Sequence, residues 1–92
     1  MSELRIELPT SETEMEALRP RLDAALKKEF PGGMLQRRWD GDVLRLSGPG
    51  AEGSIVLEEG RLVGQAELKP PASLMRPMIE QKIAAAMKQA AG

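Results

Sequence analysis

Apolar and charged residues alternate near the start of the chain, in the stretch ELRIEL at residues 3–8. Leu4, Ile6 and Leu8 fall on one side of this stretch, and the charged residues between them fall on the other. A period of two is typical of a half-buried β-strand. We expect the strand to end at Pro9, because proline has no backbone N–H to donate.

The spacing of apolar residues then changes to that of a helix. They recur every three or four positions, at Met15, Leu18, Leu22, Ala25 and Leu26. This pattern predicts a helix over residues 12–29 that buries one face.

Two local signals qualify the start and the middle of that helix. Ser11 and Glu14 have the spacing of a capping box, which predicts that they cap its first turn. Pro20 lies in its interior, where the missing N–H and the ring disturb the backbone. We therefore expect either one helix kinked near Arg19 or two short helices that meet there.

Asp40-Gly41, between two strand-like runs, predicts a hairpin with a two-residue turn. The inner face would carry Trp39, Leu44, Leu46 and Leu35, because paired residues share a face. Trp39 would then be an inward-facing anchor of the hairpin. The pairs that this turn predicts are Trp39 with Asp42, Arg37 with Leu44, and Leu35 with Leu46.

The stretch SGPGAEG at residues 47–53 predicts a loop, because it is rich in glycine and proline. A second hairpin follows, with its turn at Glu59-Gly60. Its inner face would carry Ile55, Leu57, Leu62, Ala66 and Leu68. A last helix is predicted after residues 69–73, and its buried stripe would be Met75, Met78, Ile79, Ile83, Ala86, Met87 and Ala90.

The predicted order of elements is β-α-β-β-β-β-α. Two amphipathic helices and a sheet with one apolar face favour an α+β two-layer sandwich, with a mainly antiparallel sheet and both helices on one face. A chain of 92 residues has the length of one domain, so we expect residues 1–92 to form a single α+β domain.

Composition narrows the range of functions. The chain has no histidine and no cysteine, which removes the commonest general base, thiolate catalysis and thiolate metal sites. Asp40 and Asp42 flank a turn glycine and are better explained as solvated turn residues. We therefore expect no enzyme activity, no catalytic or metal-binding residues and no cofactor.

The charge and the apolar runs bear on the partners of the chain. The net charge is −1, which gives no general attraction to nucleic acid. No apolar run approaches the roughly 20 residues of a transmembrane helix. We expect a cytoplasmic protein without a transmembrane segment.

Two candidate binding sites follow from the predicted fold. One is the face of the sheet away from the helices, where Met34, Val43, Val56 and Val63 could form an apolar patch for a partner or a homodimer. The alternative explanation of this patch is ordinary β-propensity on a solvated face. The other candidate is a gap between helices and sheet near Trp39, Met75 and Ile79, where a small apolar ligand could lie.

Three stretches, RWDGDVLRL, GSIVLEEGRLVGQAEL and LMRPMIEQKI, resemble the polyhydroxyalkanoic acid system proteins of bacteria, the polyhydroxyalkanoate granule-region family. The resemblance extends over nearly the whole chain. The residues that carry it are Trp39, Gly41, Asp42, Leu44, Gly53, Val56, Leu68, Leu74 and Pro77.

The resemblance implies a link to the metabolism of polyhydroxyalkanoate, a storage polyester held in cytoplasmic granules. It supplies no catalytic residues. We therefore expect a non-enzymatic accessory protein that associates with the granule or with granule proteins. The alternatives are a carrier of a small hydrophobic ligand and a homo-oligomeric interaction module.

Overall fold

The computed structural model describes residues 2–92. The strands are β1 (Ser2–Pro9), β2 (Gln36–Asp40), β3 (Val43–Gly48), β4 (Ala51–Glu58) and β5 (Arg61–Leu68). The helices are α1 (Met15–Glu29) and α2 (Arg76–Ala91), each next to a short 3-10 helix, η1 (Pro31–Gly33) after α1 and η2 (Ala72–Met75) before α2. The α+β class and the predicted order of elements are confirmed.

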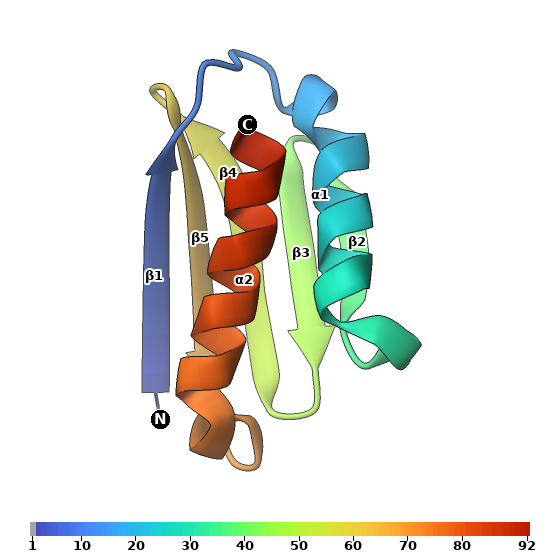
Figure 1. The fold of residues 1–92 in the computed structure, drawn as a ribbon. Coiled ribbons are helices and arrows are strands. Elements are labelled where there is room, and N and C mark those ends of the chain that lie inside the picture. The colour runs from blue at the N-terminus through green and yellow to red at the C-terminus, as the bar shows by residue number, and fades with distance from the viewer. Residues whose placement is uncertain (1) are drawn as a thin grey trace.

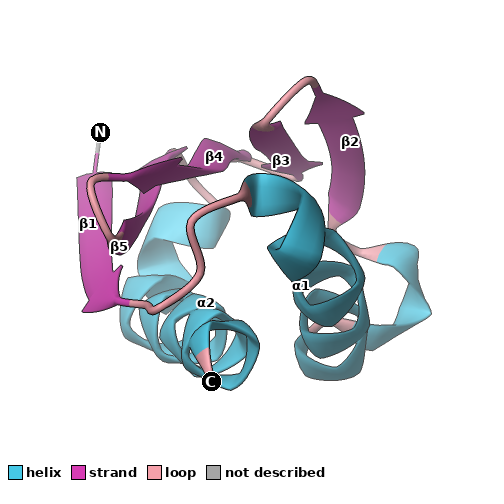
Figure 2. Ribbon diagram, turned by 90° about the horizontal axis from the view of Figure 1, so that it is seen from above, coloured by secondary structure: helices cyan, strands magenta, loops and turns pink. Residues whose placement is uncertain are grey.

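The five strands form one antiparallel sheet in the order β1-β5-β4-β3-β2. The last four strands follow one another as a meander, and β1 completes the sheet beside β5. Both helices lie on the same face of the sheet (Figures 1 and 2). The other face carries no helix among the described residues, and it is called the outer face below.

The register of the first hairpin was predicted wrongly. Trp39 pairs with Leu44 and Arg37 with Leu46, so the turn is Gly41-Asp42 and not Asp40-Gly41. Gly41 has a φ of 60°, and Asp42 is not among the residues with positive φ. This is the pattern of a type II′ turn, which needs glycine at its first central position.

The faces of the two hairpins were predicted correctly despite this shift. Leu44 and Leu46 are buried, and Trp39 and Leu35 pack against the same core. The second hairpin turns at Glu59-Gly60 as predicted, with positive φ at both residues.

The predicted loop at residues 47–53 is a tight turn instead. Gly48 pairs with Ala51, so only Pro49 and Gly50 connect β3 to β4. Gly50 has a φ of 75°, which fits the third residue of a type II turn after proline. Strands β3 and β4 continue on either side of this turn. Three two-residue turns therefore connect β2, β3, β4 and β5 in succession.

Helix α1 begins later than predicted and without the predicted capping box. Its N-cap residue is Glu14, which makes no side-chain capping hydrogen bond, and its first helical residue is Met15. Pro20 lies inside one uninterrupted helix and is exposed to solvent. The five apolar residues of the predicted stripe are all buried.

One half of the space between helices and sheet is filled by large side chains. Leu18 and Leu22 of α1 and Met87 of α2 meet Leu44 and Ile55 of the sheet, and each is fully buried. Burying one such side chain contributes about 1.5–3 kcal/mol. This region, where the start of α1 lies beside the end of α2, is called the packed half.

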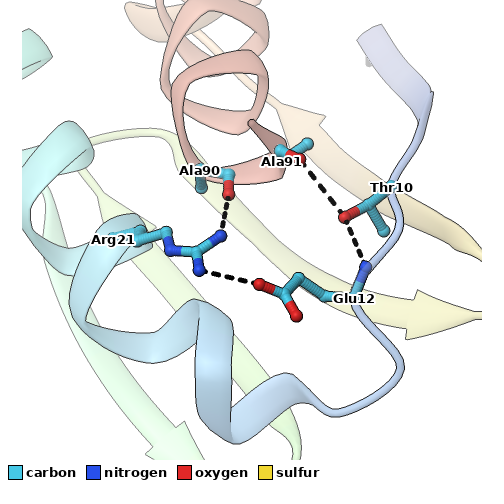
Figure 3. Close-up of polar contacts among 5 residues, drawn as sticks. All are labelled: Thr10, Glu12, Arg21, Ala90 and Ala91. Atoms are coloured by element: carbon cyan, nitrogen blue, oxygen red, sulfur yellow. Dashed lines mark hydrogen bonds and ion pairs between the residues drawn. The ribbon is translucent and has the colours of Figure 1, made fainter.

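Polar contacts hold the helices together at this end. Arg21 Nη1 donates to the carbonyl oxygen of Ala90 over 3.3 Å, and Thr10 Oγ1 lies 3.4 Å from that of Ala91 (Figure 3). Arg21 also pairs with Glu12 at 2.7 Å. These contacts satisfy carbonyl groups at the C-terminus of α2 that have no partner within the helix.

Trp39 attaches the first hairpin to α1. Its indole N–H donates to both carboxylate oxygens of Asp23, at 3.2 and 3.1 Å. The Arg19 guanidinium lies 4.9 Å from the ring centroid, within range of a cation–π interaction. The predicted role of Trp39 as an inward-facing anchor agrees with this position.

Candidate functional site

The other half of the helix–sheet space is not filled. In Figure 1 the two helices diverge from the C-terminus of α2 towards the turn between β3 and β4. A cavity of about 300 Å³ lies there, lined almost entirely by apolar atoms. This cavity is called the apolar groove below.

The floor of the apolar groove is formed by the smallest residues of the sheet. They are Gly48, Ala51, Gly53 and Ala66, from β3, β4 and β5. Gly48 pairs with Ala51, and Gly53 pairs with Ala66, so the four positions form two adjacent pairs. Because no side chain here is longer than a methyl group, the sheet leaves the space above it empty.

Gly53 cannot be replaced by a larger residue without moving the sheet. A Cβ atom at this position would overlap the carbonyl oxygen of Gln65 and lie 2.9 Å from the Cβ of Ala66. Glycine is therefore required at position 53 by the close approach of β4 and β5.

One wall of the groove follows the end of α1. The chain passes from Phe30 through η1 to Met34 and Leu35, and these residues line the groove together with Pro31. The glycines of η1, Gly32 and Gly33, have φ values of 83° and 74°. These left-handed conformations, which glycine adopts without strain, turn the chain after α1 has ended at Glu29.

The other wall is the end of η2 and the first half of α2. Met75 of η2 and Met78, Ile79 and Lys82 of α2 line the groove at helical spacing, and Ile83 lies where the groove meets the packed half. Met75 and Met78 were predicted to be buried, and this was wrong: 49% and 40% of their surfaces are exposed. The burial fails because α1 does not extend over the start of α2.

Three exposed methionines surround the opening. Met34 is 69% exposed and joins Met75 and Met78 in lining the groove. Only one other large apolar side chain of residues 2–92 is as exposed, Leu74. The three are called the methionine rim; methionine side chains are flexible and adapt to irregular apolar partners.

Lys82 brings a positive charge to the groove. Its Nζ donates to the backbone oxygen of Glu29 over 3.1 Å and lies 6.0 Å from the centroid of the Phe30 ring. The carboxylate of Glu29 interacts instead with Gln89, which is two turns further along α2 and does not line the groove. Glu52 also borders the groove, but it alternates with the inward-facing Gly53 and is exposed on the outer face.

The predicted ligand gap is only partly assembled. Met75 and Ile79 line the groove, whereas Trp39 does not line it and instead contacts Asp23 of α1. Two features of the sequence indicate the groove itself. Small residues occupy inward positions at Gly53 and Ala66. The apolar stripe of the last helix begins with methionine, at Met75 and Met78, and not with leucine.

The predicted apolar patch on the outer face is spread over two regions. Met34 precedes β2 and lines the groove. Val43 and Val56 are half-buried on the outer face, and Val63 beside them is only 3% exposed. The valines therefore present little continuous apolar surface.

Charged and polar residues cover most of the outer face. One row across the strands carries Arg5, Gln65, Ser54, Arg45 and Arg38, and the next carries Glu3, Glu67, Glu52, Ser47 and Gln36. Beside Val63, Glu7 accepts hydrogen bonds from Arg5 and Arg61, which hold the pKa of its carboxyl below the usual range. The rows of both signs make this face polar and mixed in charge.

Neither α1 nor α2, nor any other helix in residues 2–92, has the length and apolarity needed to cross a membrane. The same residues contain no cluster of three or more acidic side chains arranged to hold a metal ion.

The comparison with protein families gives one match. A family model described as "Putative polyhydroxyalkanoic acid system protein" matches residues 11–90, from before α1 to the last turn of α2. None of the curated proteins compared matches the chain. The matched region includes the whole apolar groove and the methionine rim. The chain therefore belongs to the polyhydroxyalkanoic acid system protein family.

Proposed function

We propose that this protein is a non-enzymatic accessory protein of polyhydroxyalkanoate metabolism. It attaches to the polyester of cytoplasmic storage granules through the methionine rim and the apolar groove. The observation that carries the proposal is an open apolar cavity with three exposed methionines at its mouth. Membership of the family supplies the link to the polyester.

The physical basis is the burial of apolar surface. Full burial of one methionine side chain contributes about 1.5–3 kcal/mol, and the rim residues are already partly buried. Three such side chains can contribute a few kcal/mol together, which supports reversible attachment to a hydrophobic surface. Their flexibility suits a polymer surface that has no single shape.

The absence of catalytic chemistry in the groove supports the non-enzymatic role. The sequence has no histidine or cysteine, and the carboxylates of Glu29 and Glu52 are directed away from the groove as described above. The groove can therefore bind apolar groups but offers no acid–base pair to act on them.

Co-sedimentation with purified polyhydroxyalkanoate granules tests this proposal. The test variant is Met75→Asp with Met78→Asp, which places charge on the rim at two exposed positions. The matched control is Val56→Asp, which places charge on the outer face. Thermal melting of each variant shows whether it is folded.

We expect wild type and Val56→Asp to sediment with granules and the double rim variant to remain in solution. Loss of binding in Val56→Asp alone would place attachment on the outer face instead. If wild type itself does not sediment, direct attachment to the polyester is wrong, and a granule protein becomes the partner to test.

A further inference from the structure

The apolar groove contains a positive charge whose contacts within the protein use only part of its hydrogen-bonding capacity. Lys82 is partly buried, and its ammonium group has three N–H donors. One of them bonds to the backbone oxygen of Glu29. Among residues 2–92, no carboxylate lies within ion-pair distance of Lys82.

Six of the basic residues, Arg5, Arg21, Arg37, Arg45, Arg61 and Arg76, pair with carboxylates. Arg19, Arg38 and the other lysines have no carboxylate partner among residues 2–92 either, so Lys82 is set apart by its position. Lys82 is the basic residue that lines the apolar groove, and the carboxylates of the acidic residues near it are directed away from the groove. A partly buried cation favours an anionic partner, because a charge is costly to bury unpaired.

The size of the groove limits what can bind there. Its volume of about 300 Å³ is at the lower end of the range for small-molecule pockets. The floor of glycine and alanine leaves room for one narrow chain between the helices. Long-chain lipids would exceed this space, whereas a medium-length aliphatic chain matches it.

We propose that the apolar groove binds a medium-chain aliphatic carboxylic acid, with its chain on the Gly53–Ala66 floor and its carboxylate at Lys82. The inference rests on the proposed role of the groove as a site for apolar groups and names its ligand class. The carboxylate of the ligand accepts hydrogen bonds from the remaining N–H groups of Lys82, while the bond from Lys82 to the backbone oxygen of Glu29 is kept. The methionine rim closes over the chain.

Methionine methyl groups provide the readout. In protein labelled with ¹³C at the methionine methyls, Met34, Met75 and Met78 report on the groove, and Met15 and Met87 in the packed half are internal controls. The probes are octanoate, 1-octanol and acetate. Octanol has the chain without the charge, and acetate has the charge without the chain.

We expect octanoate to shift the rim methyls and leave Met15 and Met87 unchanged. Octanol should bind about tenfold more weakly, which is the typical value of one charge-assisted hydrogen bond, and acetate should not bind. Lys82→Gln keeps a donor for Glu29 but removes the charge, so octanoate should then bind as weakly as octanol. Lys88→Gln, an exposed change on the same helix, should have no effect.

Two results would overturn the inference. One is equal affinity of wild type for octanoate and octanol; the other is a lack of any shift of the rim methyls. Either can occur while granule co-sedimentation still succeeds, in which case the rim binds polyester without a carboxylate site. Conversely, octanoate binding without co-sedimentation would support the proposed ligand class and contradict the proposed attachment to granules.

Discussion

The two halves of the helix–sheet space are built from the same two helices and the same sheet, yet they differ in content. In the packed half, Gly64 of β5 leaves a gap that Met87 fills: a Cβ there would lie 2.8 Å from the Met87 sulfur. In the open half, Gly53 and Ala66 leave a gap that no helix residue fills. The difference arises because α1 ends at Glu29 and the chain then turns away. On the other side of the groove, η2 and the first half of α2 extend further.

This contrast indicates a division of roles. Stability is concentrated where leucine, isoleucine and methionine interdigitate, and the apolar opening is confined to the end where the helices diverge. A protein of this size has a small margin of stability, so leaving one part of its core unfilled is costly. We interpret the open half as a binding region for this reason.

The largest effect is expected from truncation in the packed half. Leu44→Ala removes a fully buried side chain below both helices. The free energy of unfolding should fall by about 2–5 kcal/mol, because a cavity forms in a well-packed region. Urea unfolding measures this, and a loss below about 1 kcal/mol would remove the distinction between the halves.

A smaller loss is expected from Trp39→Ala. The side chain is half-buried, so the free energy of unfolding should fall by about 2 kcal/mol, less than for a fully buried tryptophan. Trp39→Phe retains the ring but loses the bond to Asp23, and should lose about 1 kcal/mol. A Trp39→Ala protein that unfolds like wild type would show that the hairpin does not depend on its contact with α1.

Overfilling the packed half should also destabilise the protein. Gly64→Ala places a methyl group against the sulfur of Met87 and should lower the free energy of unfolding by about 1–3 kcal/mol. The flexible end of Met87 can move, so the lower part of this range is expected. Combining the change with Met87→Leu tests the contact: if the two losses simply add, Met87 is not the residue that Gly64 accommodates.

The smallest effect on stability is expected on the outer face. Arg5 and Arg61 lower the pKa of Glu7 in the folded protein, so this carboxylate stabilises the fold above its unfolded pKa. That contribution is lost as the pH falls through the lowered pKa. Glu7→Gln should therefore reduce the melting temperature slightly at neutral pH and not at all in strong acid. A loss that grows on acidification would contradict the assignment.

The order of elements and the inner face of each strand could be predicted from the sequence, because periods of two and of three to four are local signals. The register of the first hairpin could not. In the sequence Asp40-Gly41-Asp42, glycine can occupy either central position of a turn, and the correct choice depends on bringing Trp39 opposite Leu44.

The candidate site was harder to predict than the fold. Met75 and Met78 have the same spacing as the buried residues of α2, so the pattern indicates a core stripe throughout. Their exposure depends on where α1 ends in space, which no local pattern contains. Lys82 gave no signal, because a lysine beside an apolar stripe is ordinary in an amphipathic helix.

The central claim is that the open half is kept empty for binding, and Ala66→Leu tests it most directly. This change extends a larger apolar side chain from the floor into the groove, where space exists. Melting and binding of octanoate and granules are measured on the same preparation. We predict a melting temperature equal to or slightly above that of wild type, with loss of both kinds of binding. Unchanged binding by a stable Ala66→Leu protein would contradict the claim.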